Sequence, residues 1–277
     1  MRAQRRARHG LVRLGPRGAA ARRAPHRGPL RPAGPRLQRI VPAPADRRGR
    51  GPTAAGEADR VAGVLDALGL PGPATVVGHS LAAFHAEAFA RLHPERTAGV
   101  VLVDGSVEED PSPAPARDLR TAAARARGRA VTAAGLPRAL GPTLRRLTVR
   151  ATSMRRTDPA PDDLLRRCYG SGRVARAVLL ENARYRDVAA ELIALRAERP
   201  LPPVPVAVLA ASHGNGSWFE RRWLDRQRRL AELLDARFET VAPAGHLLML
   251  DRPQAVADAV LSVTPTRESN PSQTPGA

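Results

Sequence analysis

The sequence predicts an α/β protein with a mostly parallel sheet that is interrupted by one helical insertion. Short apolar runs alternate with amphipathic helical patterns over residues 53–104 and again over residues 204–263. The segment between them, residues 110–200, is rich in Ala, Arg and Leu and shows no strand pattern. Strands that alternate with helices favour parallel pairing, because each helix returns the chain to the start of the next strand.

The first half of the pattern predicts a helix, a strand, a second helix and a second strand. We expect the first helix at Thr53–Leu68, ended by the Gly- and Pro-rich turn at residues 69–73. Ala74–Gly78 is a short apolar run, which we expect to be a strand buried on both faces of the sheet. A helix at Leu81–Leu92 and a strand at Ala98–Asp104 complete a β-α-β unit.

The second half resumes after the insertion, which Pro and Gly divide into four helical pieces. The pattern predicts a strand at Val204–Ala210, a helix at Trp218–Leu234, a strand at Phe238–Val241 and a helix at Pro253–Val263. The insertion begins at the carboxyl end of a strand, where open α/β sheets bind their ligands. We therefore interpret it as a lid.

The net charge of +19 lies mostly at the N-terminus. Residues 1–50 contain 15 arginines and a single acid, Asp46, which leaves a charge of only +5 on the remainder. Residues 1–45 combine Arg, Pro and Gly without apolar periodicity, which predicts a disordered leader. Arginine neutralises phosphates, but no aromatic residues are interleaved here to stack on bases. We favour an out-of-frame or mis-started translation of GC-rich DNA over a nucleic-acid-binding arm.

The composition excludes several classes of protein. The single cysteine, Cys168, rules out a disulfide framework and any multi-cysteine metal site. No apolar run approaches the roughly 18 residues that span a membrane. We expect a cytoplasmic protein with no cofactor or metal, and a small-molecule substrate rather than a membrane or a nucleic acid. The oligomeric state is not indicated, and residues 264–277, rich in Pro, Ser and Thr, are predicted to be a disordered tail.

A candidate nucleophile, Ser80, lies in Gly78-His79-Ser80-Leu81-Ala82, where the first predicted strand meets the following helix. A tight strand-to-helix turn forces the central residue into strained backbone geometry and exposes its side chain at the end of the sheet. The small residues on either side, Gly78 and Ala82, let strand and helix approach closely. The alternative interpretation is a serine that only caps the helix.

A serine hydroxyl needs a base to take its proton. Among the seven histidines, His246 follows the last predicted strand and precedes the last helix, so its loop opens at the same edge of the sheet as Ser80. His213, which also follows a strand, is a second possibility. His79, His85 and His93 are too close to Ser80 in sequence to reach over it from across the sheet.

These features resemble the α/β-hydrolase family over roughly residues 46–263. The resemblance rests on the serine turn, on Gly245-His246 with Asp251 and Pro253 downstream, and on the size of the insertion. It implies a core formed by residues 46–109 and 201–263, with residues 110–200 as the helical lid. It also implies an oxyanion-binding N–H on Leu81. About three N-terminal strands of the family are missing or replaced in this chain, and only His9-Gly10 stands where the second oxyanion loop belongs.

The family orients its histidine with an acid, which lies between the serine and the histidine in chain order. The loop after the third predicted strand, where this acid is usual, has no carboxylate before Glu220. Asp104, at the end of the preceding strand, preserves the chain order, and some family branches place the acid there. We assign the acid to Asp104 and keep Glu220 and Asp225 as alternatives.

The resemblance implies a serine hydrolase that cleaves an ester-like bond of a small hydrophobic substrate through Ser80, His246 and Asp104 with an acyl-enzyme intermediate. A serine at this turn argues against epoxide and haloalkane hydrolysis, for which related branches use a carboxylate. Two alternatives stay open: a catalytically dead remnant with an incomplete N-terminus, and an arginine-rich nucleic-acid-binding protein.

Overall fold

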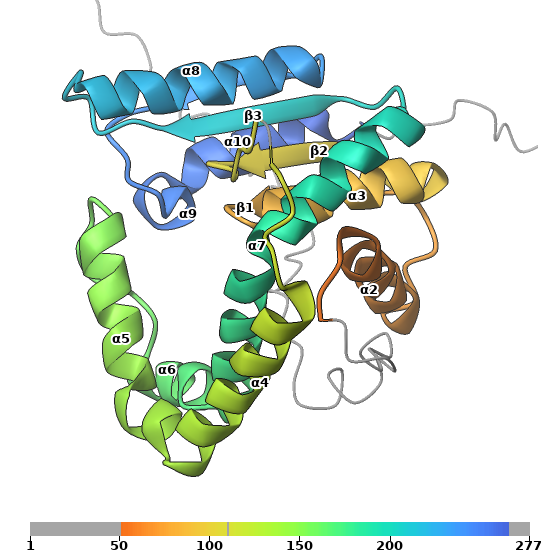
Figure 1. The fold of residues 1–277 in the computed structure, drawn as a ribbon. Coiled ribbons are helices and arrows are strands. Elements are labelled where there is room, and N and C mark those ends of the chain that lie inside the picture. The colour runs from red at the N-terminus through yellow and green to blue at the C-terminus, as the bar shows by residue number, and fades with distance from the viewer. Residues whose placement is uncertain (1–50, 110, 266–277) are drawn as a thin grey trace, which may run out of the picture.

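The structure, a computed structural model, describes residues 51–109 and 111–265, and four parallel strands in these ranges form one sheet (Figure 1). The sheet order β1-β2-β3-β4 follows the chain order. The strands are β1 (Ala74–His79), β2 (Thr97–Val103), β3 (Val206–Ala211) and β4 (Arg237–Val241). The predicted leader, residues 1–45, lies outside the described residues, as do residues 266–277 of the tail predicted at 264–277.

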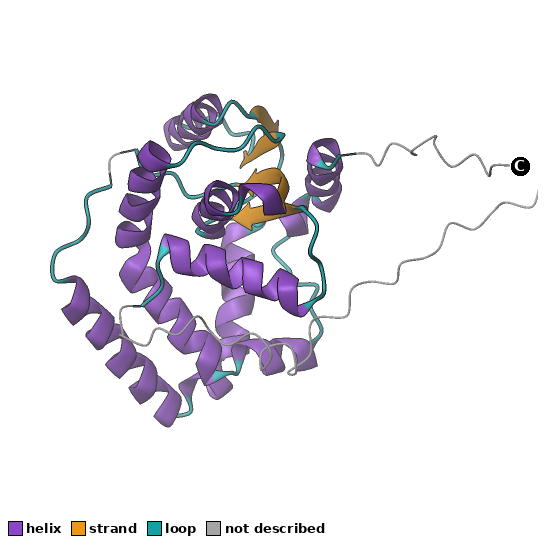
Figure 2. Cartoon of the chain, turned by 90° about the vertical axis from the view of Figure 1, so that its right-hand side faces the viewer, coloured by secondary structure: helices purple, strands orange, loops and turns teal. Residues whose placement is uncertain are grey.

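Helices cover both faces of this sheet, so the strands form an inner layer (Figure 2). Helices α3 and α8 pack on one face, whereas α9 and α10 pack on the other. The helices of this core are α2 (Ala54–Ala67), α3 (Ala82–Leu92), α8 (Trp218–Leu233), α9 (Leu248–Asp251) and α10 (Pro253–Val263), with a short 3-10 turn at Pro94–Arg96.

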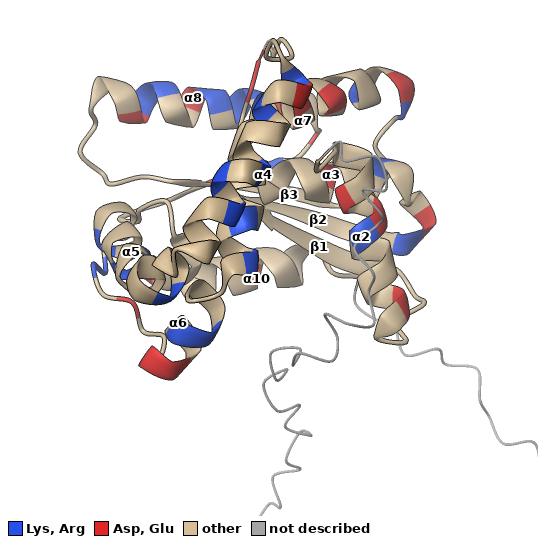
Figure 3. Cartoon of the chain, turned by 60° about the horizontal axis from the view of Figure 1, so that its bottom comes forward, with Lys and Arg blue, Asp and Glu red and all other residues tan. Residues whose placement is uncertain are grey.

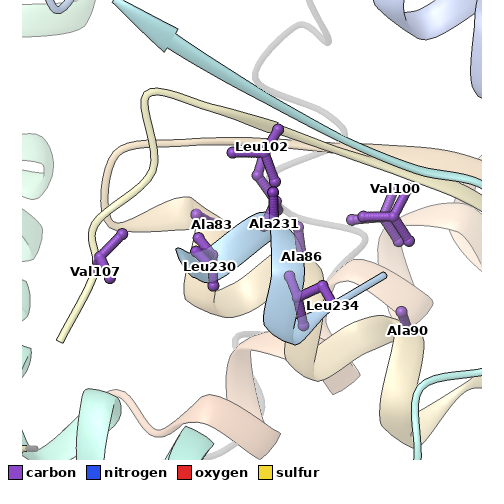
Figure 4. Close-up of a cluster of buried hydrophobic side chains, with 11 residues drawn as sticks. Ala83, Ala86, Ala90, Val100, Leu102, Val107, Leu230, Ala231 and Leu234 are labelled. Atoms are coloured by element: carbon purple, nitrogen blue, oxygen red, sulfur yellow. The ribbon is translucent and has the colours of Figure 1, made fainter. Parts of the chain in front are cut away.

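The core on the α3 and α8 face is made of small and branched side chains (Figure 4). Alanines of α3 approach β2 closely, and leucines of α8 fill the space beside them. Burial of such side chains contributes roughly 25 cal/mol for each Å² of apolar surface removed from water. The labelled members are Ala83, Ala86, Ala90, Val100, Leu102, Val107, Leu230, Ala231 and Leu234.

The predicted strands and core helices are confirmed, with two differences in the strands and one additional helix. The third strand begins at Val206 rather than Val204, because Pro205 has no backbone N–H to donate to the sheet. The first strand is not buried on both faces as predicted, since Val77 is 47% exposed. Among the described strands, β1 lies at one end of the sheet and pairs with β2 alone. The single-turn helix α9 was not predicted because four residues are too few to show a periodicity.

The insertion between β2 and β3 contains four helices and no strand over residues 111–200, as the sequence predicts. Figure 1 shows α4 beside the first part of α7 below the sheet, with α5 to their left, while the end of α7 rises to α3. The helices are α4 (Arg117–Ala133), α5 (Leu136–Thr152), α6 (Asp162–Tyr169) and α7 (Gly172–Glu198).

Buried ion pairs fasten the insertion to the core. Glu87 of α3 is 2% exposed and receives hydrogen bonds from Arg91 of its own helix and from Arg196 of α7. Within the insertion itself, Asp187 of α7 accepts from Arg184 and from Arg120 of α4. Removing one partner of such a pair typically costs about 3–5 kcal/mol, because the other charge is left buried. The base of the insertion is therefore held firmly on α3.

Charged residues of both signs occur along the helices of the described core (Figure 3). On α8, Glu220, Asp225 and Glu232 alternate with arginines. Surface charge of mixed sign is typical of a solvated helix face. It fits the small net charge predicted for the chain after residue 50.

Candidate active site

Ser80 occupies a strained turn between β1 and α3. Its φ of 54° lies in the left-handed region, which costs a non-glycine residue roughly 1–2 kcal/mol. The turn is held by hydrogen bonds to the end of β2: the Ser80 N–H donates to Val103 O at 3.3 Å, and the Ser80 carbonyl accepts from Ser106 N at 3.0 Å. The strain predicted for this turn is thus present, and backbone contacts maintain it.

The two small residues of the turn play different parts. A Cβ on Gly78 would lie 2.4 Å from the carbonyl oxygen of Ala82, so the strand and the first turn of α3 approach too closely for a side chain. Ala82 itself is exposed. The methyl group that it carries at a position where the family usually has glycine therefore enters no crowded contact.

His246 and Asp104 are brought into direct contact from loops 142 residues apart. Nδ1 of His246 lies 2.6 Å from Oδ2 of Asp104, whose side chain is 4% exposed, while the His246 side chain is 39% exposed. Asp104 follows β2 directly with a positive φ of 44°, and His246 lies between β4 and α9. A short hydrogen bond from an imidazole to a buried carboxylate fixes the orientation of the ring.

The second oxygen of Asp104 is also fully engaged. Oδ1 accepts from the backbone N–H of Ala211 and from Nε1 of Trp223, both at 2.9 Å. One oxygen is thus committed to the sheet and α8, and the other is left for His246. Trp223 could not be predicted from the sequence, because its contact depends on how α8 packs over the end of β2.

His246 lies against the serine turn through His79. The Nε2 atom of His79 is 2.8 Å from the His246 carbonyl oxygen, and the two rings are 4.6 Å apart between centroids. Burial is the main cause that lowers the pKa of His79, so its ring is neutral and one nitrogen can donate to that carbonyl. The residue before Ser80 and the backbone of His246 therefore meet at the carboxyl edge of the sheet.

The alternative acids have other partners. Glu220 accepts from Ser212 Oγ at 2.6 Å and from the backbone N–H groups of Gly214 and Gly216, so it organises its own loop. The Ser212 hydroxyl is the main cause that lowers the pKa of Glu220. Asp225 pairs with Arg228 at 3.1 Å on the surface of α8. His213, the second candidate base, is exposed in the Glu220 loop.

Leu81 follows Ser80 at the N-terminus of α3. The first N–H groups of a helix have no partner within the helix, so they are available to an anionic oxygen. The second oxyanion candidate, His9-Gly10, lies outside the described residues. Across residues 51–109 and 111–265, no group of three or more His, Cys, Asp or Glu side chains is arranged to hold a metal ion. No helix in these ranges is long and apolar enough to cross a membrane.

A parallel sheet that carries a serine at a strained strand-to-helix turn, with a histidine and a buried acid at the same edge, defines an α/β hydrolase. The family model described as the alpha/beta hydrolase family matches residues 10–259. The chain therefore belongs to this family. The match begins inside the segment 1–45, earlier than the resemblance found from the sequence.

Solved structures with similar folds include Cfl2 from Burkholderia cenocepacia, with 20% identity and a TM-score of 0.54 over 76% of this chain and 71% of that chain. Another is ALR0039 from Nostoc sp. PCC 7120, with 19% identity and a TM-score of 0.50 over 76% of this chain and 72% of that chain. A thermophilic esterase from Thermogutta terrifontis aligns with 23% identity and a TM-score of 0.43 over 76% and 72%. A search of curated proteins finds no match. The first two of these structures support the fold alone.

Proposed function

We propose that this hydrolase cleaves an ester-like bond of a small hydrophobic substrate with Ser80 as nucleophile, His246 as base and Asp104 as the orienting acid. The observation that carries the proposal is the 2.6 Å contact between His246 Nδ1 and Asp104 Oδ2 beside a serine in the left-handed conformation. Acyl transfer by a serine requires a nucleophile, a base that takes its proton and an acid that orients the base.

The reaction has two halves. In the first, Ser80 Oγ attacks the carbonyl carbon while His246 Nε2 takes its proton, and the Leu81 N–H donates to the developing oxyanion. His246 then gives the proton to the leaving alcohol, which leaves an acyl group on Ser80. In the second half, His246 activates a water that attacks the acyl carbonyl, and the acid product leaves as the Ser80 hydroxyl is restored. Asp104 stabilises the charged imidazole in both halves.

The hydrophobic substrate is proposed from the insertion, which we assign as the lid. Helix α5 reaches the His246 loop, since the Thr152 carbonyl accepts from Leu247 N at 3.4 Å. The same helix bears four leucines that are between 43% and 58% exposed, and this apolar surface on the insertion supports a hydrophobic substrate. They are Leu136, Leu140, Leu144 and Leu147. A cytoplasmic location remains a prediction.

The test is ester turnover by single and double variants. Ser80→Ala and His246→Ala should each abolish hydrolysis of short p-nitrophenyl esters, and the double variant should be no slower than either single variant, because members of a catalytic unit are not additive. Turnover of Ser80→Ala at the wild-type rate would overturn the proposal. His213→Ala, which changes an exposed histidine, is the matched control and should keep full activity.

A further inference from the structure

The carboxylate of Asp251 stands at the junction between the insertion and the loop that carries His246. It lies at the end of the single-turn helix α9, five residues after the histidine. On the histidine side, Gly245 N donates to Oδ2 at 2.7 Å. This bond fixes the backbone of the residue directly before His246.

On the insertion side, three donors from the end of α5 converge on the same carboxylate. Met154 N donates to Oδ2 at 2.9 Å, Arg155 N donates to Oδ1 at 3.0 Å, and the Ser153 hydroxyl also donates to Oδ1. Four donors thus meet one carboxylate. When it is ionised, this group has no proton to donate and acts only as an acceptor. No neutral side chain of the same size could satisfy all four.

Close backbone packing supports the same junction independently. A Cβ on Gly245 would lie 2.4 Å from the carbonyl oxygen of Thr152, so the end of α5 and the histidine loop touch where only glycine fits. The Arg155 guanidinium donates to the Leu250 carbonyl at 3.3 Å. The insertion and the histidine loop therefore form one packed unit.

We propose that Asp251 is a positioning residue that ties the insertion to the His246 loop, so that the placement of the insertion and the placement of the base are coupled. This inference rests on the proposed function, because it gives His246 the part of the base. The other end of the loop is fastened to the sheet, since Ala244 N donates to Ser212 O at 2.8 Å. Asp251 secures the side that faces the insertion.

The charge state of Asp251 agrees with this part. Burial alone would raise the pKa of the carboxyl, but the hydrogen bonds from Ser153, Gly245, Met154 and Arg155 outweigh it and hold the pKa below the usual range. An ionised Asp251 can accept all four hydrogen bonds.

The test compares Asp251→Asn with Asp258→Asn, which makes the same change on the exposed face of α10. Asp251→Asn keeps the size of the side chain but presents an amide N–H₂ to N–H donors. We expect kcat for p-nitrophenyl butyrate to fall about 10- to 100-fold, since displacing a reacting group by about 1 Å can cost 100-fold. Asp258→Asn should match the wild type.

A second measurement, independent of substrate, separates positioning from a merely structural part. The proton shared by His246 and Asp104 should give a far-downfield proton NMR resonance that His246→Ala removes. Asp251→Asn should shift or broaden this resonance, and Asp258→Asn should leave it unchanged. An unchanged resonance together with wild-type kcat in folded Asp251→Asn would overturn the inference. If Ser80→Ala stayed active, the proposed function would fail instead.

If Asp251→Asn does not fold, the Ser153→Ala variant tests the same coupling. It removes one of the three donors on the insertion side and leaves the carboxylate in place. We expect a smaller loss of kcat with a shift of the same resonance. A wild-type spectrum and wild-type kcat for Ser153→Ala would then count against the coupling.

Discussion

Replacing Asp104 by asparagine should cost far more activity than the loss of one negative charge suggests. Oδ1 of Asp104 accepts two N–H groups, from Ala211 and from Trp223. An asparagine that keeps these two bonds must place its carbonyl oxygen there and turn its amide N–H₂ toward His246. Nδ1 of His246 would then have to accept, so the ring proton moves to Nε2. A ring protonated at Nε2 cannot take the proton of Ser80.

The opposite amide orientation does not rescue the enzyme. It would point the N–H₂ group at two buried N–H donors, and each buried group left unsatisfied costs about 1–3 kcal/mol. In Asp104→Asn, the two N–H donors to residue 104 therefore favour the inactive tautomer of His246. The same change of tautomer in a serine protease triad lowers kcat by about 10⁴-fold. That factor equals about 5 kcal/mol of activation free energy, and we expect a loss of this order.

The assay is kcat for a p-nitrophenyl ester in three purified variants. Asp104→Asn should lose several orders of magnitude, whereas Glu220→Gln and Asp225→Asn should stay close to the wild type. Circular dichroism melts confirm that each variant is folded. A loss below about tenfold for Asp104→Asn would refute the tautomer argument, because one factor of ten is only about 1.4 kcal/mol. A larger loss in Glu220→Gln would move the acid to that residue.

Three further predictions concern contacts around the site and the core. Trp223→Phe removes one of the two donors that hold Oδ1 of Asp104, so the carboxylate is held less firmly against His246 and kcat should fall; an unchanged kcat would contradict this. Gly245→Ala places a methyl against Thr152 O, 2.4 Å away, and should lower the melting temperature, whereas Gly214→Ala in the exposed Glu220 loop should lower it less. Burial lowers the pKa of His85 from 6.5 to about 4, so the unfolded chain binds more protons between these values and stability is lost as the pH falls through this window. His85→Gln should flatten the dependence of urea unfolding on pH between 7 and 5, and an equal slope in both proteins would show that His85 does not cause it.

The sequence was enough to predict the order of strands and helices, because their periodicity is local. Ser80 and His246 could be placed at one edge of the sheet because both follow strands whose carboxyl ends meet there. Chain order favours Asp104 as the acid but does not exclude Glu220, whose hydrogen bonds to its own loop depend on tertiary structure. The order of residues along the chain does not reveal which carboxylate already accepts hydrogen bonds from other partners.

The contacts that support the site could not be predicted in the same way. Trp223 and Asp251 act on partners roughly 100 residues away, across the packing of α8 and of the insertion. The exposure of Val77 depends on which strands flank β1, and a run of apolar residues does not carry that information. These features follow from tertiary packing rather than from local pattern.

Covalent labelling tests the central claim most directly. The intact mass of the purified chain is measured before and after reaction with a fluorophosphonate, which traps an activated serine nucleophile. The account predicts a single adduct on Ser80 that Ser80→Ala removes and His246→Ala slows strongly. A folded wild-type protein that gains no adduct, or a Ser80→Ala variant that still gains one, would contradict it.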